Sequence, residues 1–227
     1  MARLVSVNLG LRRPIAAKSG WSGIDKRPTD GPVSLRVPAP KGSGPDEISG
    51  LLGDTICDTA SHGGPNQAVY AYAREDLDRW QTTLGQSLSC GSFGENLTTR
   101  GLDVTGALIG ERWQVGSQVV LEVTGPRIPC ATFAAWMRHH GWLKTFTRQA
   151  VPGAYLRIVE AGAIAAGDPI MVTSRPPHPV SIGLAFRALT LEPHLLGTVL
   201  EAADYLEAEI LERARRRQPF TLFPSDE

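Results

Sequence analysis

Cysteine is scarce in this sequence, which has only Cys57, Cys90 and Cys130 among its 227 residues and no Cys-x-x-Cys pair. An odd number of thiols without such a pair excludes a disulfide framework and a four-thiolate zinc site, and it indicates a reducing compartment. An excess of either charge is also missing, since 23 Lys and Arg residues balance 23 Asp and Glu residues. Nucleic acids and anionic membranes attract basic surfaces, so this balance argues against both as partners.

Long apolar runs are missing as well. No stretch approaches the ~18 apolar residues that a membrane span requires, and polar residues interrupt the first residues too early for a signal-peptide core. We therefore expect a soluble, cytoplasmic protein. Several familiar motifs are absent: the GxxxxGK[ST] phosphate loop, GxGxxG, HExxH and the GxSxG elbow. Other signals must therefore indicate the chemistry.

The 24 glycines and 17 prolines fall mostly in the first 180 residues, where they separate short apolar runs. This pattern is typical of strands and turns, and β-branched residues make 118–124 the strongest predicted strand. A helix is predicted over 131–143. After the proline-rich stretch 175–179 the sequence becomes poor in glycine, and apolar residues recur at helical spacing from 180 to 217. The sequence thus predicts an α+β protein with a β-rich domain over 1–175 and a small helical module over 176–220.

Two glycine-containing segments could bind a ligand. In residues 61–68, His62 precedes two glycines, which allow a sharp turn that exposes backbone N–H groups to an anion. An ordinary turn with a solvated histidine is the alternative. In residues 92–99, Glu95, Asn96 and Thr98 follow Gly94, and such side chains can hydrogen-bond to the edge of a heterocycle. A loop whose polar side chains cap its own backbone would have the same composition.

The third segment carries a thiol. Cys130 follows the strongest predicted strand and directly precedes a predicted helix, a position that favours the thiolate, and Arg127 adds positive charge three residues earlier. A buried, unreactive cysteine is the alternative. Cys57 and Cys90 have no such setting, so we interpret both as structural.

These segments occur together in a recognisable order. The sequence resembles the MOSC domain, the family related to the C-terminal domain of molybdenum cofactor sulfurase, and within it the bacterial YiiM-like branch. The resemblance covers about residues 3–175, and the helical tail is similar to the three-helix module that often follows this domain. The segments that carry it are Gly53-Asp54, His62–Pro65, Ala68–Tyr70, Phe93–Leu97, Ile109-Gly110, Pro126–Cys130 and Gly153–Arg157.

The resemblance implies a fold and a cofactor. The fold would be a twisted, β-barrel-like core with peripheral helices, followed by a small all-α module. The cofactor would be the molybdenum cofactor (molybdopterin) in a cleft, with Cys130 as the molybdenum ligand, which suits a soft thiolate. Five further residues would hold the pterin and its phosphate: His62, Asn96, Thr98, Arg127 and Arg157.

The resemblance also implies an activity, because relatives in this branch reduce N-hydroxylated bases such as 6-hydroxylaminopurine. Besides Cys130, the candidate catalytic residues are Glu95 and His62, as proton donors. The chain has no cysteine cluster or flavin motif, so electrons would come from a separate reductase. A second hypothesis is a carrier that delivers the molybdenum cofactor or sulfur through Cys130, and a third is a binding module with an inert thiol. The sequence departs from the family pattern at one place, where Asn66-Gln67 stands and Asp-Lys is common. Any role that the family's lysine has in phosphate or partner contact is therefore in question here.

Overall fold

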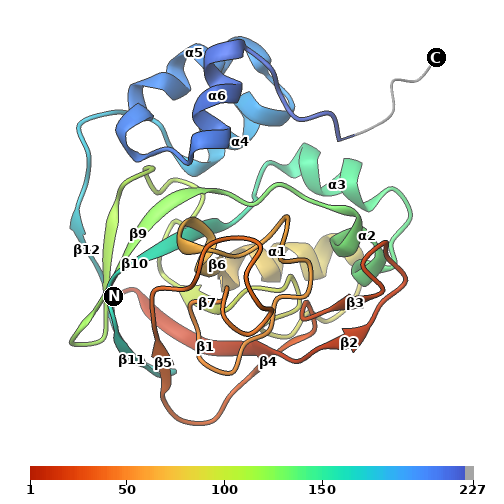
Figure 1. Cartoon of the computed structure of the whole chain (residues 1–227), viewed down its shortest axis with the longest axis vertical. Helices are drawn as coiled ribbons and strands as arrows, with labels where there is room; N and C mark the ends of the chain where they lie inside the picture. Colours follow the sequence, from red (N-terminus) through yellow and green to blue (C-terminus); the bar gives the residue numbers. More distant parts are fainter. Residues whose placement is uncertain (223–227) are drawn as a thin grey trace.

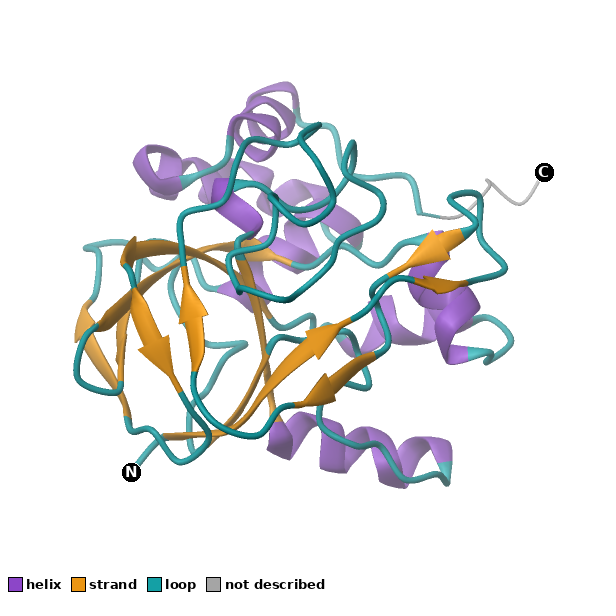
Figure 2. Ribbon diagram, turned by 60° about the horizontal axis from the view of Figure 1, so that its bottom comes forward, coloured by secondary structure: helices purple, strands orange, loops and turns teal. Residues whose placement is uncertain are grey.

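The computed structural model describes residues 1–222 and shows an α+β architecture, as the sequence predicts (Figure 1). Figure 2 shows the strands as a curved layer with helices at its periphery. The strands are β1 (Arg3–Gly10), β2 (Arg13–Pro14), β3 (Trp21–Ser22), β4 (Lys26–Pro28), β5 (Val33–Leu35), β6 (Val69–Ala73), β7 (Leu97–Arg100), β8 (Arg112–Val115), β9 (Val119–Pro126), β10 (Ala154–Glu160), β11 (Gly162–Ile164) and β12 (Ile170–Ser174).

Eight strands form one mixed sheet in the order β12-β8-β9-β10-β6-β7-β1-β4. Its neighbours pair antiparallel except β6 and β7, which run parallel. The strongest predicted strand, 118–124, is confirmed. It forms β9, which pairs with β8 on one side and β10 on the other. The apolar core fills the concave side of this sheet, with Trp113, Leu121 and Leu156 fully buried.

The barrel-like core is a partial correction. Within residues 1–222 the sheet does not close, and β12 and β4 remain as its edges. Its ends nevertheless approach each other at one corner, where an isolated bridge joins Arg3 to Pro169. Two backbone hydrogen bonds flank this bridge, from Leu4 N–H to Asp168 (2.8 Å) and from Ile170 N–H to Ala2 (2.9 Å). The strong curvature is therefore present, but a continuous ladder around a barrel is not.

Three helices pack on an aromatic cluster beside the sheet: α1 (Arg74–Leu84), α2 (Ala131–Met137) and α3 (Trp142–Gln149). Phe93 and Phe133 meet edge to face at 5.3 Å, and Trp142 lies 5.3 Å from Phe133. The single helix predicted over 131–143 is wrong. Arg138 takes a left-handed conformation (φ 52°) that ends α2, and a new helix starts after Gly141 (φ 68°).

The remaining helices lie within the segment 176–220 and gather on one side of the sheet (Figure 1). They are α4 (Ile182–Thr190), α5 (Leu196–Val199) and α6 (Ala208–Arg216), and short 3-10 turns, η2 (Pro193–Leu195) and η3 (Leu200–Tyr205), connect them. Leu189, Leu196 and Ile210 form a separate small core among them. Helix α4 also contacts β9 and places Phe186 against Phe146 of the aromatic cluster. The helical segment is therefore packed firmly onto the rest of the chain.

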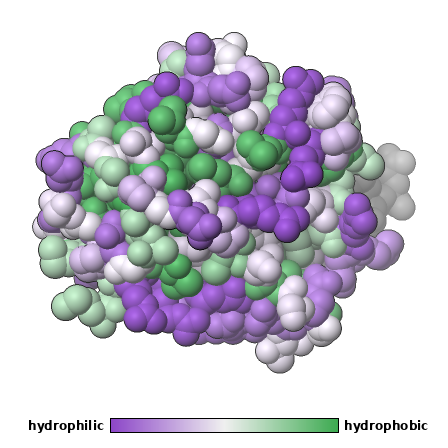
Figure 3. Space-filling view, turned by 90° about the horizontal axis from the view of Figure 1, so that it is seen from below, coloured by the Kyte–Doolittle hydropathy of each residue, from purple (hydrophilic) through white to green (hydrophobic). Residues whose placement is uncertain are grey.

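Among residues 1–222, no helix has both the length and the hydropathy that a membrane crossing requires. In the view from below, hydrophilic and hydrophobic residues are interspersed over the face (Figure 3). Large exposed apolar side chains such as Leu11, Val37 and Leu52 come from different segments.

Candidate active site

One cavity of about 100 Å³, partly open to solvent, lies where the turn after β9 meets the loops between β3 and β4 and around residues 55–63. Four of the residues singled out from the sequence line it: His62, Asn96, Arg127 and Cys130. They come from positions up to 68 residues apart, and the fold brings them to one surface. We call this space the thiol cavity.

Cys130 is the N-cap residue of α2, in extended conformation, so the predicted position of the thiol before a helix is confirmed. Burial alone would raise the pKa of this thiol. A hydrogen bond with His62, the positive charge of Arg127 and a hydrogen bond from the Phe133 backbone N–H outweigh burial and lower the pKa to about 6. Cys130 is therefore mostly a thiolate at neutral pH, the form that attacks electrophiles and binds metals.

This ionisation predicts a distinct reactivity. In cofactor-free protein, iodoacetamide should alkylate Cys130 with a midpoint near pH 6, while Cys57, whose pKa burial raises, reacts only at higher pH. His62→Ala should move the Cys130 midpoint upward, because it removes a hydrogen bond to the thiolate. Mass spectrometry of the alkylated peptides over a pH series measures both midpoints, and equal reactivity of the two thiols would contradict this electrostatic environment.

The lowered pKa of Cys130 also determines how its ionisation changes the stability of the fold with pH. An unfolded cysteine has a pKa of about 8.5, above the folded value, so the unfolded state binds more protons in between. Ionisation of Cys130 thus stabilises the fold fully above the unfolded pKa, and this contribution is lost as the pH falls through about 6.

Arg127 is a buried cation at the wall of the thiol cavity, with 6% of its surface exposed. Its Nη1 donates to the Phe93 carbonyl oxygen (2.7 Å), and its guanidinium lies 3.7 Å from the ring centroid of Phe133 and 5.2 Å from that of Tyr70. Among the described residues, none of these groups that contact Arg127 is a carboxylate. A buried guanidinium held by neutral groups retains donors and charge for an anionic ligand.

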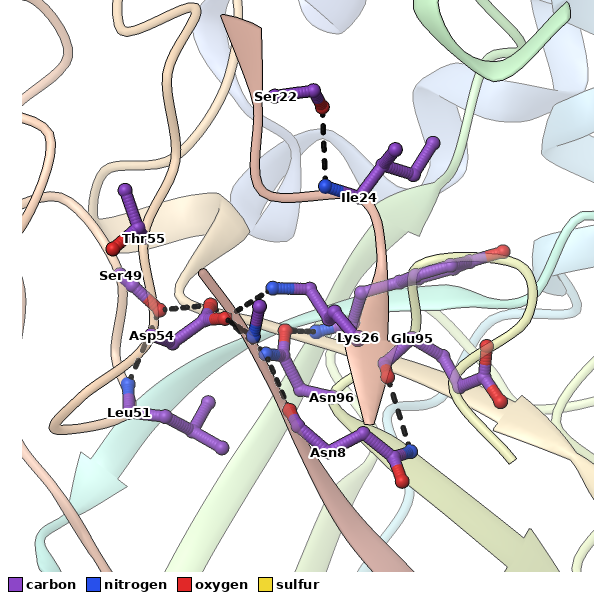
Figure 4. Close-up of polar contacts among 12 residues, drawn as sticks. Asn8, Ser22, Ile24, Lys26, Ser49, Leu51, Asp54, Thr55, Glu95 and Asn96 are labelled. Carbon is purple, nitrogen blue, oxygen red and sulfur yellow. Dashed lines mark hydrogen bonds and ion pairs between the residues drawn. The ribbon is translucent and has the colours of Figure 1, made fainter. Parts of the chain in front are cut away.

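A buried polar network supports the floor of the cavity (Figure 4). Asp54 is fully buried and forms an ion pair with Lys26, which lines the cavity. The other Asp54 oxygen accepts hydrogen bonds from Ser49 Oγ (2.7 Å) and Asn96 Nδ2 (3.0 Å). Because Asn96 also accepts from the Tyr70 backbone N–H (3.1 Å), its side chain is fixed by the protein itself. The network therefore makes the cavity floor rigid.

Breaking this ion pair should be costly. Its side chains are only 8% (Lys26) and 0% (Asp54) exposed, and removing one partner of such a pair typically costs about 3–5 kcal/mol because the other charge stays buried. We expect Lys26→Met to lower the free energy of unfolding by this amount in urea denaturation. Arg216→Met, at the exposed ion pair with Glu212, is the matched control and should cost below about 1 kcal/mol.

Glu95 and Thr98 are not brought to the thiol cavity. The Glu95 carboxylate is fully buried and accepts hydrogen bonds from the backbone N–H groups of Gly91 (2.6 Å) and Phe93 (3.0 Å) and from Thr98 Oγ1 (2.9 Å). Burial raises the pKa of Glu95, and these hydrogen bonds oppose the rise. Both side chains thus fix the loop whose Phe93 carbonyl holds Arg127.

Arg157 also lies elsewhere. It forms an ion pair with the buried Glu122 on the neighbouring strand β9, and it does not line the thiol cavity. Tyr155, two residues earlier on β10, does line it. Alternate residues of a strand point to the same face but lie ~7 Å apart along it. This spacing is enough for Tyr155 to line the cavity while Arg157 lies beyond it.

Sequence reasoning missed Lys26, Tyr70, Tyr155 and the unpaired side chain of Gln67 as cavity residues. The Gln67 amide oxygen is buried without a hydrogen-bond partner among the described residues, a state that typically costs ~1–3 kcal/mol. A donor on a bound ligand would satisfy this oxygen. Tyr70 and Tyr155 had a signal, since both lie in the segments that carry the family resemblance, and Gln67 had one as a departure from the family pattern, whereas Lys26 had none.

The fold agrees with the comparisons to known proteins. The family model described as MOSC domain matches residues 58–171, half of the chain, so the chain belongs to the MOSC domain family. It is 30% identical to YflK of Bacillus subtilis (strain 168) over 186 residues, which cover 81% of this chain and 79% of that protein. The crystal structure of YiiM from Geobacillus stearothermophilus shares the fold, with a TM-score of 0.75, 24% identity and coverage of 96% and 99%.

A further relative is a protein named reductase from Gibberella moniliformis (strain M3125 / FGSC 7600), 30% identical over 158 residues. The match covers 68% of this chain but only 26% of the reductase. The MOSC and YiiM-like resemblance predicted from the sequence is confirmed by these matches.

Proposed function

We propose that this protein is a molybdenum-cofactor-dependent oxidoreductase that reduces N-hydroxylated compounds such as 6-hydroxylaminopurine. The observation that carries the proposal is the low-pKa thiol of Cys130 in one cavity with the buried cation Arg127. The MOSC family, which is associated with this cofactor, and the relative named reductase support it.

The residues present fit the cofactor. The Cys130 thiolate is a soft ligand suited to a redox metal. Within residues 1–222 no three His, Cys, Asp or Glu side chains form a metal site, so a metal at Cys130 would bring further ligands with it, as a pterin dithiolene does. Arg127 offers fixed donors for a phosphate at the wall of the thiol cavity.

When bound, the cofactor supplies the redox chemistry of a two-electron reduction, N–OH + 2 e⁻ + 2 H⁺ → N–H + H₂O. The protein would orient the cofactor and set its environment: Cys130 would hold the metal, and Arg127 would neutralise the anionic group. His62 contacts the thiol and lines the cavity, so it is the residue placed to donate a proton. Glu95 is fully buried within the 91–96 loop, where its carboxylate holds the backbone whose Phe93 carbonyl accepts from Arg127, so we assign it a positioning role. A separate reductase in the cytoplasm would supply the electrons.

The test is to purify the protein from a host that makes the cofactor, and then to measure its molybdenum content and the reduction of 6-hydroxylaminopurine with a chemical electron donor. We expect molybdenum in stoichiometric amount and conversion of the hydroxylamine to the amine. A loaded protein that leaves this substrate intact but transfers its cofactor or sulfur to another enzyme would instead establish the carrier function. Absence of molybdenum would establish the binding module with an inert thiol.

A further inference from the structure

Two segments of the sequence carry cations and no carboxylates. Residues 1–24 contain four Lys and Arg residues, residues 123–159 contain five, and neither segment contains Asp or Glu. Because the whole chain has a net charge of zero, the rest of it carries the compensating excess of carboxylates. The charge is therefore distributed unevenly along the chain, and the fold decides whether the two basic segments meet.

The fold brings both segments to the mouth of the thiol cavity. Ser19 and Trp21, from the stretch that holds β2 and β3, line this cavity and are exposed, so they lie at its mouth. Cys130 and Thr132, at the start of α2, line it as well. Helix α2 has 7 residues, so at ~1.5 Å per residue its far end lies about 10 Å from Cys130. Strands β2 and β3 lie on the same side of the molecule as α2 and α3 in both ribbon views (Figure 1, Figure 2).

The exposed cations of these segments outnumber the carboxylates near them. Arg13 and Arg27 share a single carboxylate, that of Asp25, at 3.4 Å and 2.8 Å. Two further carboxylates, Asp46 and Asp58, come from the loop 44–58 beside the cavity. The other exposed cations form no ion pair among the described residues, and we call them the basic rim: Arg12, Lys18, Arg138, Lys144 and Arg148. The surface around the mouth of the thiol cavity is therefore positively charged.

An exposed aromatic side chain lies beside one of these cations. Trp21 is 41% exposed, and the Arg12 guanidinium lies over its ring at 4.5 Å from the centroid. Leu11, next to Arg12 in the sequence, is 62% exposed. A stacked guanidinium keeps N–H groups at its edge for a carboxylate, and Trp and Arg are enriched among the residues that carry the binding energy of protein interfaces. This part of the surface thus combines apolar contact area with positive charge.

We propose that the basic rim docks an acidic electron-carrier protein that contains a flavin or an iron–sulfur cluster, with Trp21 and Arg12 as anchors of the contact. This inference rests on the proposed function, in which a separate protein supplies the electrons. The carrier is oxidised and provides two electrons for each N–OH group that is reduced to N–H, while two protons are taken up and one water is released.

The place and the charge of the rim both favour such a partner. A carrier docked at the mouth of the thiol cavity makes its closest approach to the cofactor held at Cys130. Electron-transfer complexes have small interfaces, and complementary charges make their association fast. The balanced charge of the whole chain disfavours a long polyanion such as RNA, which requires a broad basic surface.

The first experiment measures docking without turnover. Oxidised flavodoxin, a small acidic flavin protein, is titrated into the cofactor-loaded protein by calorimetry at low salt. We expect binding that weakens at least about tenfold when the ionic strength is raised to about 0.3 M, because salt screens the opposite charges. A short single-stranded RNA is the competing probe. Binding of the RNA without binding of flavodoxin would overturn the inference and assign the basic rim to nucleic acid.

Charge reversal tests which cations take part. Lys18 and Lys144 are exposed, come from different basic segments and do not line the thiol cavity. Lys18→Glu and Lys144→Glu should each weaken flavodoxin binding about threefold, and both together about tenfold. Arg3→Glu is the matched control, since Arg3 is exposed at the start of β1, on the opposite side of the molecule from α2 (Figure 1). Equal effects of the three single reversals would refute the basic rim as the docking site.

Turnover with two electron donors separates this inference from the proposed function. Reduced methyl viologen is a small cation that needs no docking surface, whereas reduced flavodoxin is a protein that does. The double variant with Lys18→Glu and Lys144→Glu should reduce 6-hydroxylaminopurine at the wild-type rate with methyl viologen, while its kcat/KM for flavodoxin falls at least about tenfold.

Each failure has its own signature. If the wild type turned over with methyl viologen but not with flavodoxin, or if the double variant kept the wild-type kcat/KM for flavodoxin, the docking site would be refuted while the proposed function stood. If flavodoxin bound with the expected salt dependence but neither donor supported turnover, the reductase function alone would be refuted.

Discussion

Turnover of 6-hydroxylaminopurine should fall by at least about 100-fold when Cys130 is replaced by Ser, since even the loss of an outer-shell partner of a metal site can cost this much. The cause is the change of ligand. The thiol pKa of about 6 makes Cys130 a thiolate at neutral pH, whereas a serine hydroxyl stays protonated and is a harder, weaker ligand. Ser is nearly isosteric, so the fold should survive. Activity per folded protein, measured beside molybdenum content, is the readout.

The other two thiols are the controls. Cys90→Ser replaces a residue outside the thiol cavity. Cys57→Ser replaces a residue on its wall, whose thiol has a pKa that burial raises. Both variants should retain wild-type turnover per bound molybdenum. Wild-type turnover by Cys130→Ser, or equal losses in all three variants, would eliminate the thiolate ligand from the mechanism.

Arg127→Lys should weaken cofactor binding by about tenfold or more, because the charge remains but the planar fork of donors is lost. The lysine ammonium would also give up the position of the guanidinium over the Phe133 ring. The measurement is molybdenum occupancy after dialysis against decreasing cofactor concentration, or the fraction of loaded protein at a fixed expression level.

Arg74→Lys is the matched control for this variant. Arg74 is also buried and donates to a backbone carbonyl, that of Leu88 (2.8 Å), but it does not line the thiol cavity. Its replacement should lower the unfolding temperature without changing occupancy. If both variants lost stability and occupancy in parallel, Arg127 would be a structural residue and not an anion-binding one.

Much of the fold could be predicted because its local signals are strong. The β-branched run at 118–124 forms β9, and the change in composition after residue 175 precedes the segment that holds α4–α6. The helix predicted over 131–143 failed because Arg138, which is not a glycine, takes a left-handed conformation that no local pattern announces. Whether a curved sheet closes depends on long-range pairing such as Arg3 with Pro169, which periodicity cannot reveal.

The candidate site was only partly predictable. Motifs located His62, Asn96, Arg127 and Cys130 because each lies in a segment with distinctive neighbours, and the structure places these four on one cavity. Lys26 lies in an unremarkable stretch and reaches the cavity only through its long-range pair with Asp54. Glu95, Thr98 and Arg157 were predicted from the same motifs and lie outside this cavity, because a polar side chain that bonds its own loop or a buried partner has the same local pattern as one that lines a cavity.

The bridge between Arg3 and Pro169 has a consequence for biosynthesis. The Leu4 backbone groups and the Ala2 carbonyl oxygen bond to residues 167–170, so this edge of the first strand to leave the ribosome must wait until most of the chain has been translated. At the usual ~5–20 residues per second, this delay is on the order of ten seconds or more. During that time the outer edge of β1 is unpaired, and an unpaired edge is prone to pair with other chains. Closure of this corner of the sheet therefore waits until residues 167–170 have been made, long after β1 itself.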